Sequence, residues 1–354
     1  MRLVEWQGKR LLRRHGIPVP RGSVVASPGD LDKVSLPFPW MLKAQVPAGK
    51  REKAGGVIHA DDMDMARDAA EHLLGSTLHR FSVSEVLVEE YVPHDVERYL
   101  AVTVDREQGM PLLLHGRHGG VDVEEREEIL RLPVHPLAGL QPYQLRQLGD
   151  MADVAQKLYH LFRAYDCRLA EINPLADVDG SPMALDAKIE VDDNALFRHP
   201  DLPRENPGMT LLEREARDAG LAFVELDGNI GVIANGAGLT MATLDALHRY
   251  GGRGMFLDLA GTDSPDMVKK AFQILQRAAP DVIFVNLFGG ITRCDTVARG
   301  ILDALDETGV DVPVVARIRG TNERQAAEML QGTVIAIPSF QMAARRAAEL
   351  GGKP

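Results

Sequence analysis

Residues 281–295 have the sequence DVIFVNLFGGITRCD, in which a short apolar run ends at two glycines and a polar segment follows. An apolar run of this length, rich in Val, Ile and Phe, is typical of a strand buried on both faces of a sheet. Gly289 and Gly290 then open a turn, after which we expect a helix to about Leu305. The stretch predicts one strand–turn–helix unit of an α/β domain.

Four further apolar runs surround this stretch, and a helical segment follows nearly every one of them. They are residues 229–234, 254–259, 312–318 and 334–337. Ser264-Pro265 predicts a helix start, because Ser caps free N–H groups and Pro has the right φ for the first turn. Five strands alternating with amphipathic helices predict a doubly wound parallel sheet, as in flavodoxin-like domains. Ligands of such sheets bind at the carboxyl ends of the strands, where the turns at 235–238 and 289–292 lie.

The first half of the chain is less regular. Residues 6–15 predict a helix that stops at Gly16, and the segments 41–46, 83–90 and 99–104 predict strands. Glycine pairs at 55–56 and 119–120 predict hairpin turns or phosphate loops, and prolines crowd the stretch after Arg198. We therefore expect a first domain over 1–205, a linker over 206–221 and a second domain over 222–354.

Length, charge and cysteine content narrow the class of protein. A chain of 354 residues suits two or three domains. The net charge of −11 argues against a duplex nucleic-acid partner, because such binding depends on neutralising phosphates. Two cysteines without CxxC spacing fit a reducing cytosol. The charged start predicts no signal peptide, and no apolar run approaches the length of a bilayer span, so we expect a cytoplasmic protein without membrane contact.

Several cations in the first half have two possible interpretations. Lys43 lies in an apolar strand, where a cation usually belongs to a solvated face. The alternative is a contact to phosphate, which suits a mobile point charge. Lys50, Arg51 and Lys53 precede Gly55-Gly56 and could form either a phosphate-binding turn or an ordinary solvated loop.

Hard oxygen ligands occur in the segment Glu171-Ile172-Asn173-Pro174-Leu175 and again at Asp186. Carboxylate and amide oxygens on neighbouring strands suit Mg²⁺, which also takes phosphate oxygens and water. The alternative is an ion pair with Lys188. Further on, the N-terminus of the helix after Gly290 could hold a phosphate or carboxylate, or it could be a turn without a ligand. Cys294 has no nearby His in the sequence, which favours packing over catalysis.

The order of these motifs resembles that of the beta subunit of succinyl-CoA synthetase, whose relatives include malate–CoA ligase and part of ATP-citrate lyase. The resemblance covers nearly the whole chain. It rests on Gln7, the strand around Lys43, Lys53–Val57, Glu89, Glu97, Glu171–Leu175, Asp193–Arg198, Leu226–Gly231, Asn235–Gly238 and Asn286–Asp295. It implies an N-terminal ATP-grasp domain followed by a flavodoxin-like CoA-ligase domain.

The resemblance also implies roles for individual residues. Glu171 would contact a histidine loop of the partner, Asn173 and Asp186 would bind Mg²⁺, and two larger groups would bind the other ligands. The nucleotide group is Lys43, Lys50, Arg51, Glu52, Glu89, Val92 and Glu97. The group for the acid substrate and phosphate is Asn235, Gly290, Ile291 and Thr292.

The family implies an ADP-forming acid–CoA ligase in which a partner alpha subunit carries the phosphohistidine and the CoA site. No histidine loop of that type occurs here, so we expect this chain to be half of an enzyme. Succinate is the expected acid, with malate as the alternative, and the nucleotide is ATP or GTP. A different possibility is a regulatory or scaffold subunit that has lost ligase activity.

One departure favours that last possibility. The family usually has Gly-Arg-Gly where this chain has Lys50-Arg51-Glu52. Glycine lets the backbone approach phosphates closely, and Glu52 adds negative charge near the expected triphosphate. We therefore expect weaker nucleotide binding than is usual in the family.

Overall fold

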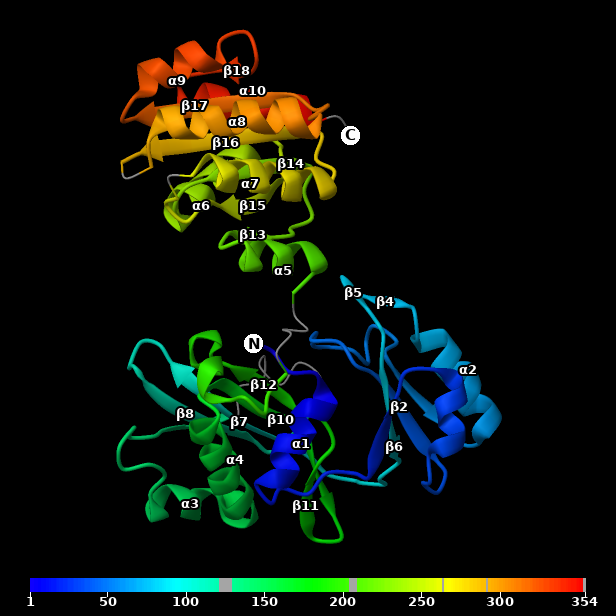
Figure 1. Ribbon diagram of the computed structural model, residues 1–354. Coiled ribbons are helices and arrows are strands. Elements are labelled where there is room, and N and C mark those ends of the chain that lie inside the picture. The colour runs from blue at the N-terminus through cyan, green and yellow to red at the C-terminus, as the bar shows by residue number, and fades with distance from the viewer. Residues whose placement is uncertain (121–128, 204–208, 263, 291, 353–354) are drawn as a thin grey trace. The chain divides into compact units, whose positions relative to one another are not determined.

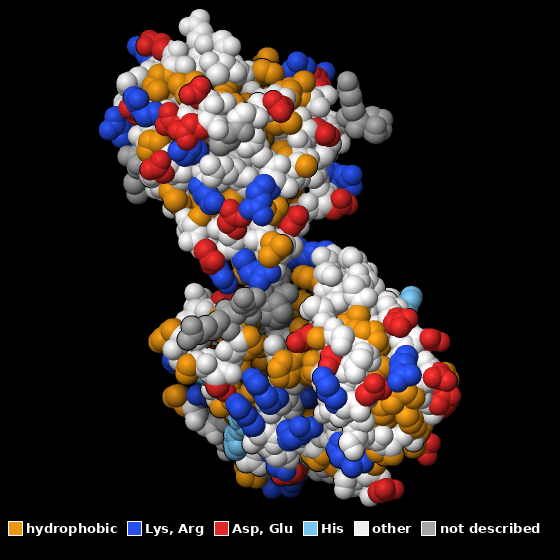
Figure 2. Space-filling view, turned by 45° about the vertical axis from the view of Figure 1, so that its right-hand side comes forward, with side chains coloured by type: hydrophobic (Ala, Val, Ile, Leu, Met, Phe, Trp, Pro, Cys, Tyr) orange, Lys and Arg blue, Asp and Glu red, His pale blue; other side chains and the backbone are white. Residues whose placement is uncertain are grey.

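The computed structural model describes residues 1–120, 129–203, 209–262, 264–290 and 292–352. The chain divides into two units, Met1–Gly208 and Met209–Pro354 (Figure 1). On the face shown in Figure 2, acidic and basic side chains are interspersed over both units, with hydrophobic side chains scattered among them. In the described part of the chain, no helix has the length and apolarity needed to cross a bilayer.

A four-stranded antiparallel sheet forms one half of the first unit. Its strand order is β1 (Gly22–Val25), β6 (Val86–Glu90), β2 (Trp40–Ala44), β3 (Val57–Ala60). Helix α2 (Met63–Leu73) packs on β2 and β3. The fully buried Trp40, Leu42 and Val88 show why β2 and β6 occupy the centre of the sheet. Lys43 is therefore placed inside the unit, between a buried Leu and a buried Ala.

The other half of the first unit is a six-stranded sheet with helices packed on it (Figure 1). Its strands run in the order β11 (Ser181–Ala184), β10 (Cys167–Val178), β7 (Glu97–Asp105), β8 (Met110–Gly116), β9 (Ile129–Pro133), and β12 (Lys188–Val191) also pairs with β10. Its helices are α1 (Glu5–Arg14), α3 (Pro142–Leu148) and α4 (Ala152–Ala164). The remaining elements are a hairpin of β4 (Thr77–Leu78) with β5 (Phe81–Ser82) and 3-10 turns at Pro28–Lys33, Gly149–Met151 and Asp193–Arg198.

The second unit is built on one six-stranded sheet. Its order is β13 (Ala222–Val224), β15 (Gly254–Asp258), β14 (Ile230–Ala234), β16 (Val282–Gly289), β17 (Val314–Gly320), β18 (Ile335–Ala336), with β13 antiparallel and the others parallel. One apolar cluster joins the sheet to α5 (Leu211–Asp218), α7 (Pro265–Arg277), α8 (Cys294–Thr308) and α9 (Glu323–Leu330). Another joins it to α6 (Ala237–Arg249) and α10 (Phe340–Gly351).

The predicted parallel sheet with helices on both faces is thus confirmed, and all five predicted strands are present. Strand β13, a three-residue antiparallel strand at the edge of the sheet, was not predicted. The stretch 206–221, expected to be a linker, contains α5, which packs on β13 and α7 within the second unit.

Two helix starts differ from expectation. Helix α8 begins at Cys294 rather than directly after Gly290. The amide of Cys294 donates to the Thr321 carbonyl at 2.9 Å, so the neighbouring β17–α9 turn already satisfies this N–H. Helix α7 does begin at Pro265, but the Ser264 side chain makes no capping hydrogen bond, contrary to its expected role.

The close approach of β16 and β17 at their carboxyl ends requires glycine. Gly320 has a φ of +118°, and a Cβ built there would lie 2.1 Å from the Gly289 carbonyl oxygen. We expect Gly320→Ala to destabilise the second unit by about 2–5 kcal/mol, from backbone strain plus overpacking. Calorimetry or hydrogen exchange on β16 and β17 would measure this loss.

Gly238→Ala is the matched control, because a Cβ there meets nothing within 4 Å. It lies inside α6 and should be neutral or slightly stabilising. Both tryptophans, Trp6 and Trp40, lie in the first unit, so the fluorescence-detected unfolding of that unit should be unchanged in either variant. A Gly320→Ala protein as stable as the parent would contradict the steric argument.

Candidate functional site

A cavity of about 570 Å³ opens in the first unit, bordered by β2, β6, β10 and the segment 46–53. This volume falls in the usual range for small-molecule sites, roughly 300–1,000 Å³. The cavity is lined by every residue of the first unit for which a role in binding was predicted from the sequence. They are Lys43, Lys50, Arg51, Glu52, Glu89, Val92, Glu97, Glu171, Asn173 and Asp186.

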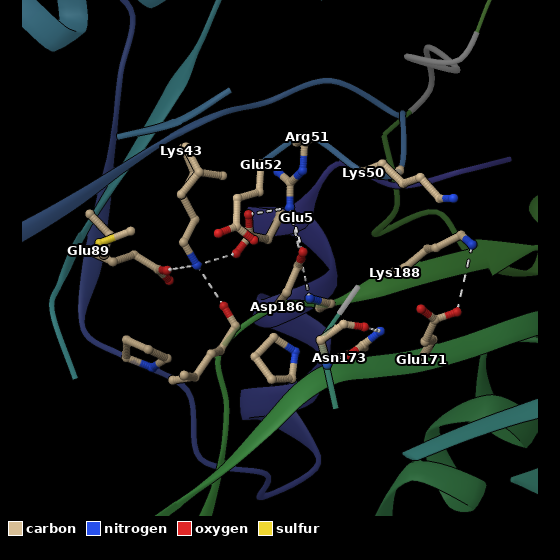
Figure 3. Close-up of a pocket in the computed structure, with 18 of the residues that line it drawn as sticks. Glu5, Lys43, Lys50, Arg51, Glu52, Glu89, Glu171, Asn173, Asp186 and Lys188 are labelled. Atoms are coloured by element: carbon tan, nitrogen blue, oxygen red, sulfur yellow. Dashed lines mark hydrogen bonds and ion pairs between the residues drawn. The ribbon is translucent and has the colours of Figure 1, made fainter. Parts of the chain in front are cut away.

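Lys43 does not lie on a solvated face, so that interpretation was wrong. Its side chain is only 11% exposed, and its Nζ lies 3.0 Å from carboxylate oxygens of both Glu5 and Glu89 (Figure 3). It also donates to the Leu185 carbonyl at 2.7 Å. Burial alone would lower the pKa of Lys43, but the attraction of Glu5, Glu89 and Asp186 outweighs burial and raises it. Lys43 is therefore a fixed positive charge in the cavity wall.

Helix α1 contributes two buried charges that sequence reasoning missed. Glu5 lies in its first turn, and Lys9 follows one turn later on the same face, 2.8 Å away. The Nζ of Lys9 also lies 2.7 and 2.5 Å from the two oxygens of Glu89. A signal was available, because these residues share the i, i+4 stripe of the helix face that buries the apolar Leu12. Opposite charges on a buried stripe point to internal partners.

Arg51 is likewise buried, which overturns the solvated-loop interpretation for this residue. Its Nη2 lies 2.8 and 3.0 Å from the two oxygens of Asp186 and 2.7 Å from Glu5 Oε2. Its Nη1 donates to the Ala44 carbonyl at 3.0 Å. Burial would lower the pKa of Arg51, but Asp186 and Glu5 raise it above its ordinary value.

These contacts join six charged side chains into one cluster, which we call the ion cluster. It contains three cations and three carboxylates, so its formal charges cancel. Burial would raise the pKa of Glu5, yet Lys43, Lys9 and Arg51 together hold the pKa of Glu5 well below its ordinary value. The members are Lys9, Lys43, Arg51, Glu5, Glu89 and Asp186. Removing any one of these charges would leave the cluster with one charge that is not balanced.

Asn173 and Asp186 supply the hard oxygens at one side of this cavity (Figure 3). The Oδ1 of Asn173 accepts from the Gly120 amide at 2.7 Å, and its Nδ2 donates to the Gly120 carbonyl at 3.1 Å. Among the described residues, no three His, Cys, Asp or Glu side chains are grouped so as to hold a metal. One amide and one carboxylate nevertheless fit Mg²⁺, which usually takes few protein ligands and completes its shell with phosphates and waters.

Glu171, Glu97 and Val92 line the same cavity. Glu171 faces Lys188 from the neighbouring strand, with 3.7 Å between their charged atoms, so the predicted alternative of an ion pair with Lys188 applies to Glu171. Glu97 Oε1 lies 3.1 Å from Nε2 of His94, whose other ring nitrogen contacts the Val92 carbonyl at 2.8 Å. Burial opposes protonation of His94, but these two contacts raise its pKa.

The departure at residues 50–52 has a clear local geometry. Lys50 is exposed, has a φ of +55°, and points away from the ion cluster. Few residues other than glycine adopt this left-handed conformation without cost. Glu52 is also exposed and has no positive φ. The backbone strain of the turn therefore falls on Lys50.

The residues predicted for the acid and phosphate lie in the second unit. Asn235 links the ends of β14 and β16, since its amide donates to the Phe288 carbonyl at 2.9 Å and accepts from the Phe288 amide at 3.0 Å. Gly290 is exposed. Thr292 is buried, and within the described residues its Oγ1 has no hydrogen-bond partner. Ile291 lies outside the described residues.

Comparisons with known proteins agree with this architecture. A family model described as an ATP-grasp domain matches residues 2–177, and one described as CoA-ligase matches 233–350. The ADP-forming succinate–CoA ligase beta subunit of Ignicoccus hospitalis is 41% identical, with 99% of each chain covered. The GDP-forming beta subunit of Thermus thermophilus is 42% identical over 94% of each chain. A structure of ATP citrate lyase from Methanothrix soehngenii shares the fold, with a TM-score of 0.75 at 18% identity over 98% and 99% of the two chains.

Because Glu5 contacts three buried cations, its neutralisation should be costly. We expect Glu5→Gln to destabilise the first unit by about 3–5 kcal/mol at pH 7, the usual effect of breaking a buried ion pair. The folded pKa of Glu5 is depressed, so its contribution is present above its ordinary pKa of 4.5 and is lost as the pH falls through the folded value. The Glu5→Gln variant should lack the part of the loss of stability at low pH that comes from protonation of Glu5. Urea unfolding followed by tryptophan fluorescence at several pH values would measure both effects.

Asp153→Asn serves as the control, since Asp153 forms an exposed i, i+4 pair with Lys157. This change should cost no more than about 1 kcal/mol. A Glu5→Gln protein that matches this control would show that the ion cluster does not stabilise the fold.

Proposed function

Because this chain belongs to the family of succinate–CoA ligase beta subunits, we propose that it is the nucleotide-binding subunit of an ADP-forming acid–CoA ligase. The complete enzyme would convert ATP, a small dicarboxylic acid and CoA into ADP, phosphate and the acyl-CoA, and it would catalyse the reverse reaction. The relatives are subunits of succinate–CoA ligases, which favours succinate as the acid. The main support for the proposal is that one cavity is lined by all ten residues that we assign to binding the nucleotide, the metal and the histidine loop.

The cavity is suited to a nucleotide phosphate chain because its wall positions two cationic side chains. Lys43 and Arg51 are buried and held in place by carboxylates, so that phosphate oxygens would meet cations that are already positioned. Asn173 and Asp186 would hold Mg²⁺, which supplies charge neutralisation between phosphoryl oxygens. Lys50, Lys53 and Lys188 line the cavity as well and add positive charge.

Glu89 would act differently from a direct nucleotide ligand. Its carboxylate is buried and contacts both Lys9 and Lys43, so it orients the Lys43 ammonium group. Val92, which follows β6, and Glu97, the first residue of β7, remain candidates for contacts with the rest of the nucleotide.

Phosphoryl transfer to the acid would require a second subunit. We place the phosphohistidine and the CoA site on a partner alpha subunit, because this chain has no histidine loop of the alpha type. Glu171 lies at the cavity wall beside Lys188 and is the proposed contact for that histidine loop. The acid and phosphate are assigned to the second unit, at Asn235 and the turn 290–292, near the carboxyl ends of β14 and β16.

The partner requirement gives the main test. The chain co-expressed with an alpha subunit of this family should form acyl-CoA from ATP, CoA and succinate, measured by the ultraviolet absorbance of the thioester. The same assay with malate and citrate would identify the acid. Asp186→Asn in the complex should lower the rate by about 100-fold or more, because charge neutralisation at the phosphates would be lost.

Nucleotide binding without thioester formation is expected of the chain alone. Thioester formation by the purified single chain would refute the proposal that a partner subunit carries the phosphohistidine and the CoA site. A complex that binds ATP but makes no thioester from any of the acids would instead favour the regulatory subunit, for which the altered turn at Lys50 is the supporting observation.

The altered turn generates a separate prediction. Lys50→Gly should relieve the left-handed strain, which stabilises the free chain, and should let the backbone approach the phosphates. That closer approach should raise nucleotide affinity roughly tenfold for each 1.4 kcal/mol gained in the bound state. The lost lysine charge is exposed and should subtract only about 0–1 kcal/mol. Glu52→Gly, without positive φ to relieve, should have the smaller effect. Calorimetry with ATP and Mg²⁺ on both single variants and the double variant would separate the two contributions. Unchanged or weaker binding by Lys50→Gly would mean that the turn is adapted to its lysine.

A further inference from the structure

Both side chains assigned to the metal are already engaged by the protein itself. Asp186 accepts two contacts from Arg51 Nη2, at 2.8 and 3.0 Å. Asn173 exchanges two hydrogen bonds with the Gly120 backbone, and its oxygen takes the shorter one, at 2.7 Å. A metal cation that enters without a nucleotide would have to displace the Arg51 guanidinium from Asp186, the one carboxylate among the two proposed ligands.

The charge balance of the ion cluster makes that displacement unfavourable. The cluster pairs three cations with three carboxylates, of which all but Asp186 are buried, while the Asp186 side chain is 38% exposed. A divalent cation added by itself would leave an excess positive charge beside Arg51 and Lys43. Uncompensated charge is costly in such surroundings. A nucleotide added together with the cation would instead supply negative phosphate oxygens for Arg51 to contact.

Arg51 is held so that only part of its contacts need to change. Its Nη1 donates to the Ala44 carbonyl, and its Nη2 also contacts Glu5. Both contacts can persist when the bond to Asp186 breaks, because neither involves Asp186. The guanidinium would then remain at the cavity wall with donors free for a phosphate, for which its planar fork is suited.

We propose that Arg51 serves as an internal counter-ion for Asp186, so that the divalent cation and the nucleotide each strengthen the binding of the other. As the cation takes Asp186, Arg51 transfers its hydrogen bonds from this carboxylate to a phosphate group. The inference rests on the proposed function in that the nucleotide occupies this cavity. By linkage, the nucleotide tightens cation binding by the same factor as the cation tightens nucleotide binding.

The test measures Mn²⁺ binding to the full-length chain without nucleotide, from the electron paramagnetic resonance signal of free Mn²⁺. The parent chain should show no stoichiometric site. Arg51→Met should gain one site, with affinity at least roughly tenfold higher than any binding by the parent, since an occupant of Asp186 has been removed. The double variant Arg51→Met/Asp186→Asn should lose that site again.

Arg2→Met is the matched control. Arg2 lines the same cavity and is also paired with a carboxylate, Glu190, at 2.8 Å, but it does not contact Asp186. This variant should bind Mn²⁺ no better than the parent. Stoichiometric binding by the parent, or equal gains in the Arg2 and Arg51 variants, would overturn the proposal.

A second measurement covers the case in which Arg51→Met folds poorly. Calorimetry on the parent chain gives the affinity for ADP with and without Mn²⁺, and the proposal requires a gain of roughly 5- to 150-fold, the usual range for coupled sites. Equal ADP affinity in both conditions would overturn it. If the parent binds no nucleotide at all, the proposed function fails, whereas the Mn²⁺ comparison between parent and Arg51 variant still decides whether Arg51 blocks the cation.

Discussion

The first unit depends on one constraint, which is that charges removed from water must be matched by opposite charges in contact with them. Glu5 is the centre of this arrangement, because it contacts cations from its own helix, from β2 and from the turn at residue 51. Asp186 and Glu89 complete the balance from two other segments. The ion cluster therefore fixes helix α1 and both sheets of the first unit around the cavity. The same contacts that fix these elements also hold Lys43 and Arg51 in the cavity wall, so stability and binding share one set of interactions.

The second unit is organised by a different principle. Apolar clusters on both faces of its parallel sheet hold the helices in place, and no comparable group of buried ion pairs occurs among its described residues. Its candidate site is formed mainly by backbone and small polar groups at the carboxyl ends of the strands. Asn235 ties β14 to β16 there, and the tight contact between Gly320 and Gly289 brings β17 close. Rigid strand ends of this kind can present a turn to a ligand without placing charge in the core.

Sequence reasoning succeeded where local pattern determines structure. The apolar runs of the second unit predicted its parallel strands, and the order of motifs predicted the fold class. The first-unit residues to which that order assigned roles line one cavity, and their roles in binding stay predictions. It failed where a residue's partner lies far away in the chain. From the sequence alone, Lys43 and Arg51 were compatible with solvated positions, because their partners Glu5 and Asp186 are distant in the chain. Glu5 and Lys9 were not predicted to belong to the site. The start of α8 was misplaced for the same reason, because the carbonyl that receives the Cys294 amide belongs to Thr321.

The distance along the chain between the members of the ion cluster affects how the protein is made. Glu5 is synthesised about 180 residues before Asp186 and the Leu185 carbonyl, which complete the surroundings of Arg51 and Lys43. During translation the charges of α1 must remain hydrated until nearly the whole first unit has left the ribosome. Contacts of such long sequence separation form late and slowly, because the intervening loop must close first. The nascent first unit thus lacks a finished cavity, and it gains one in the step that brings residues 185 and 186 to the N-terminal helix.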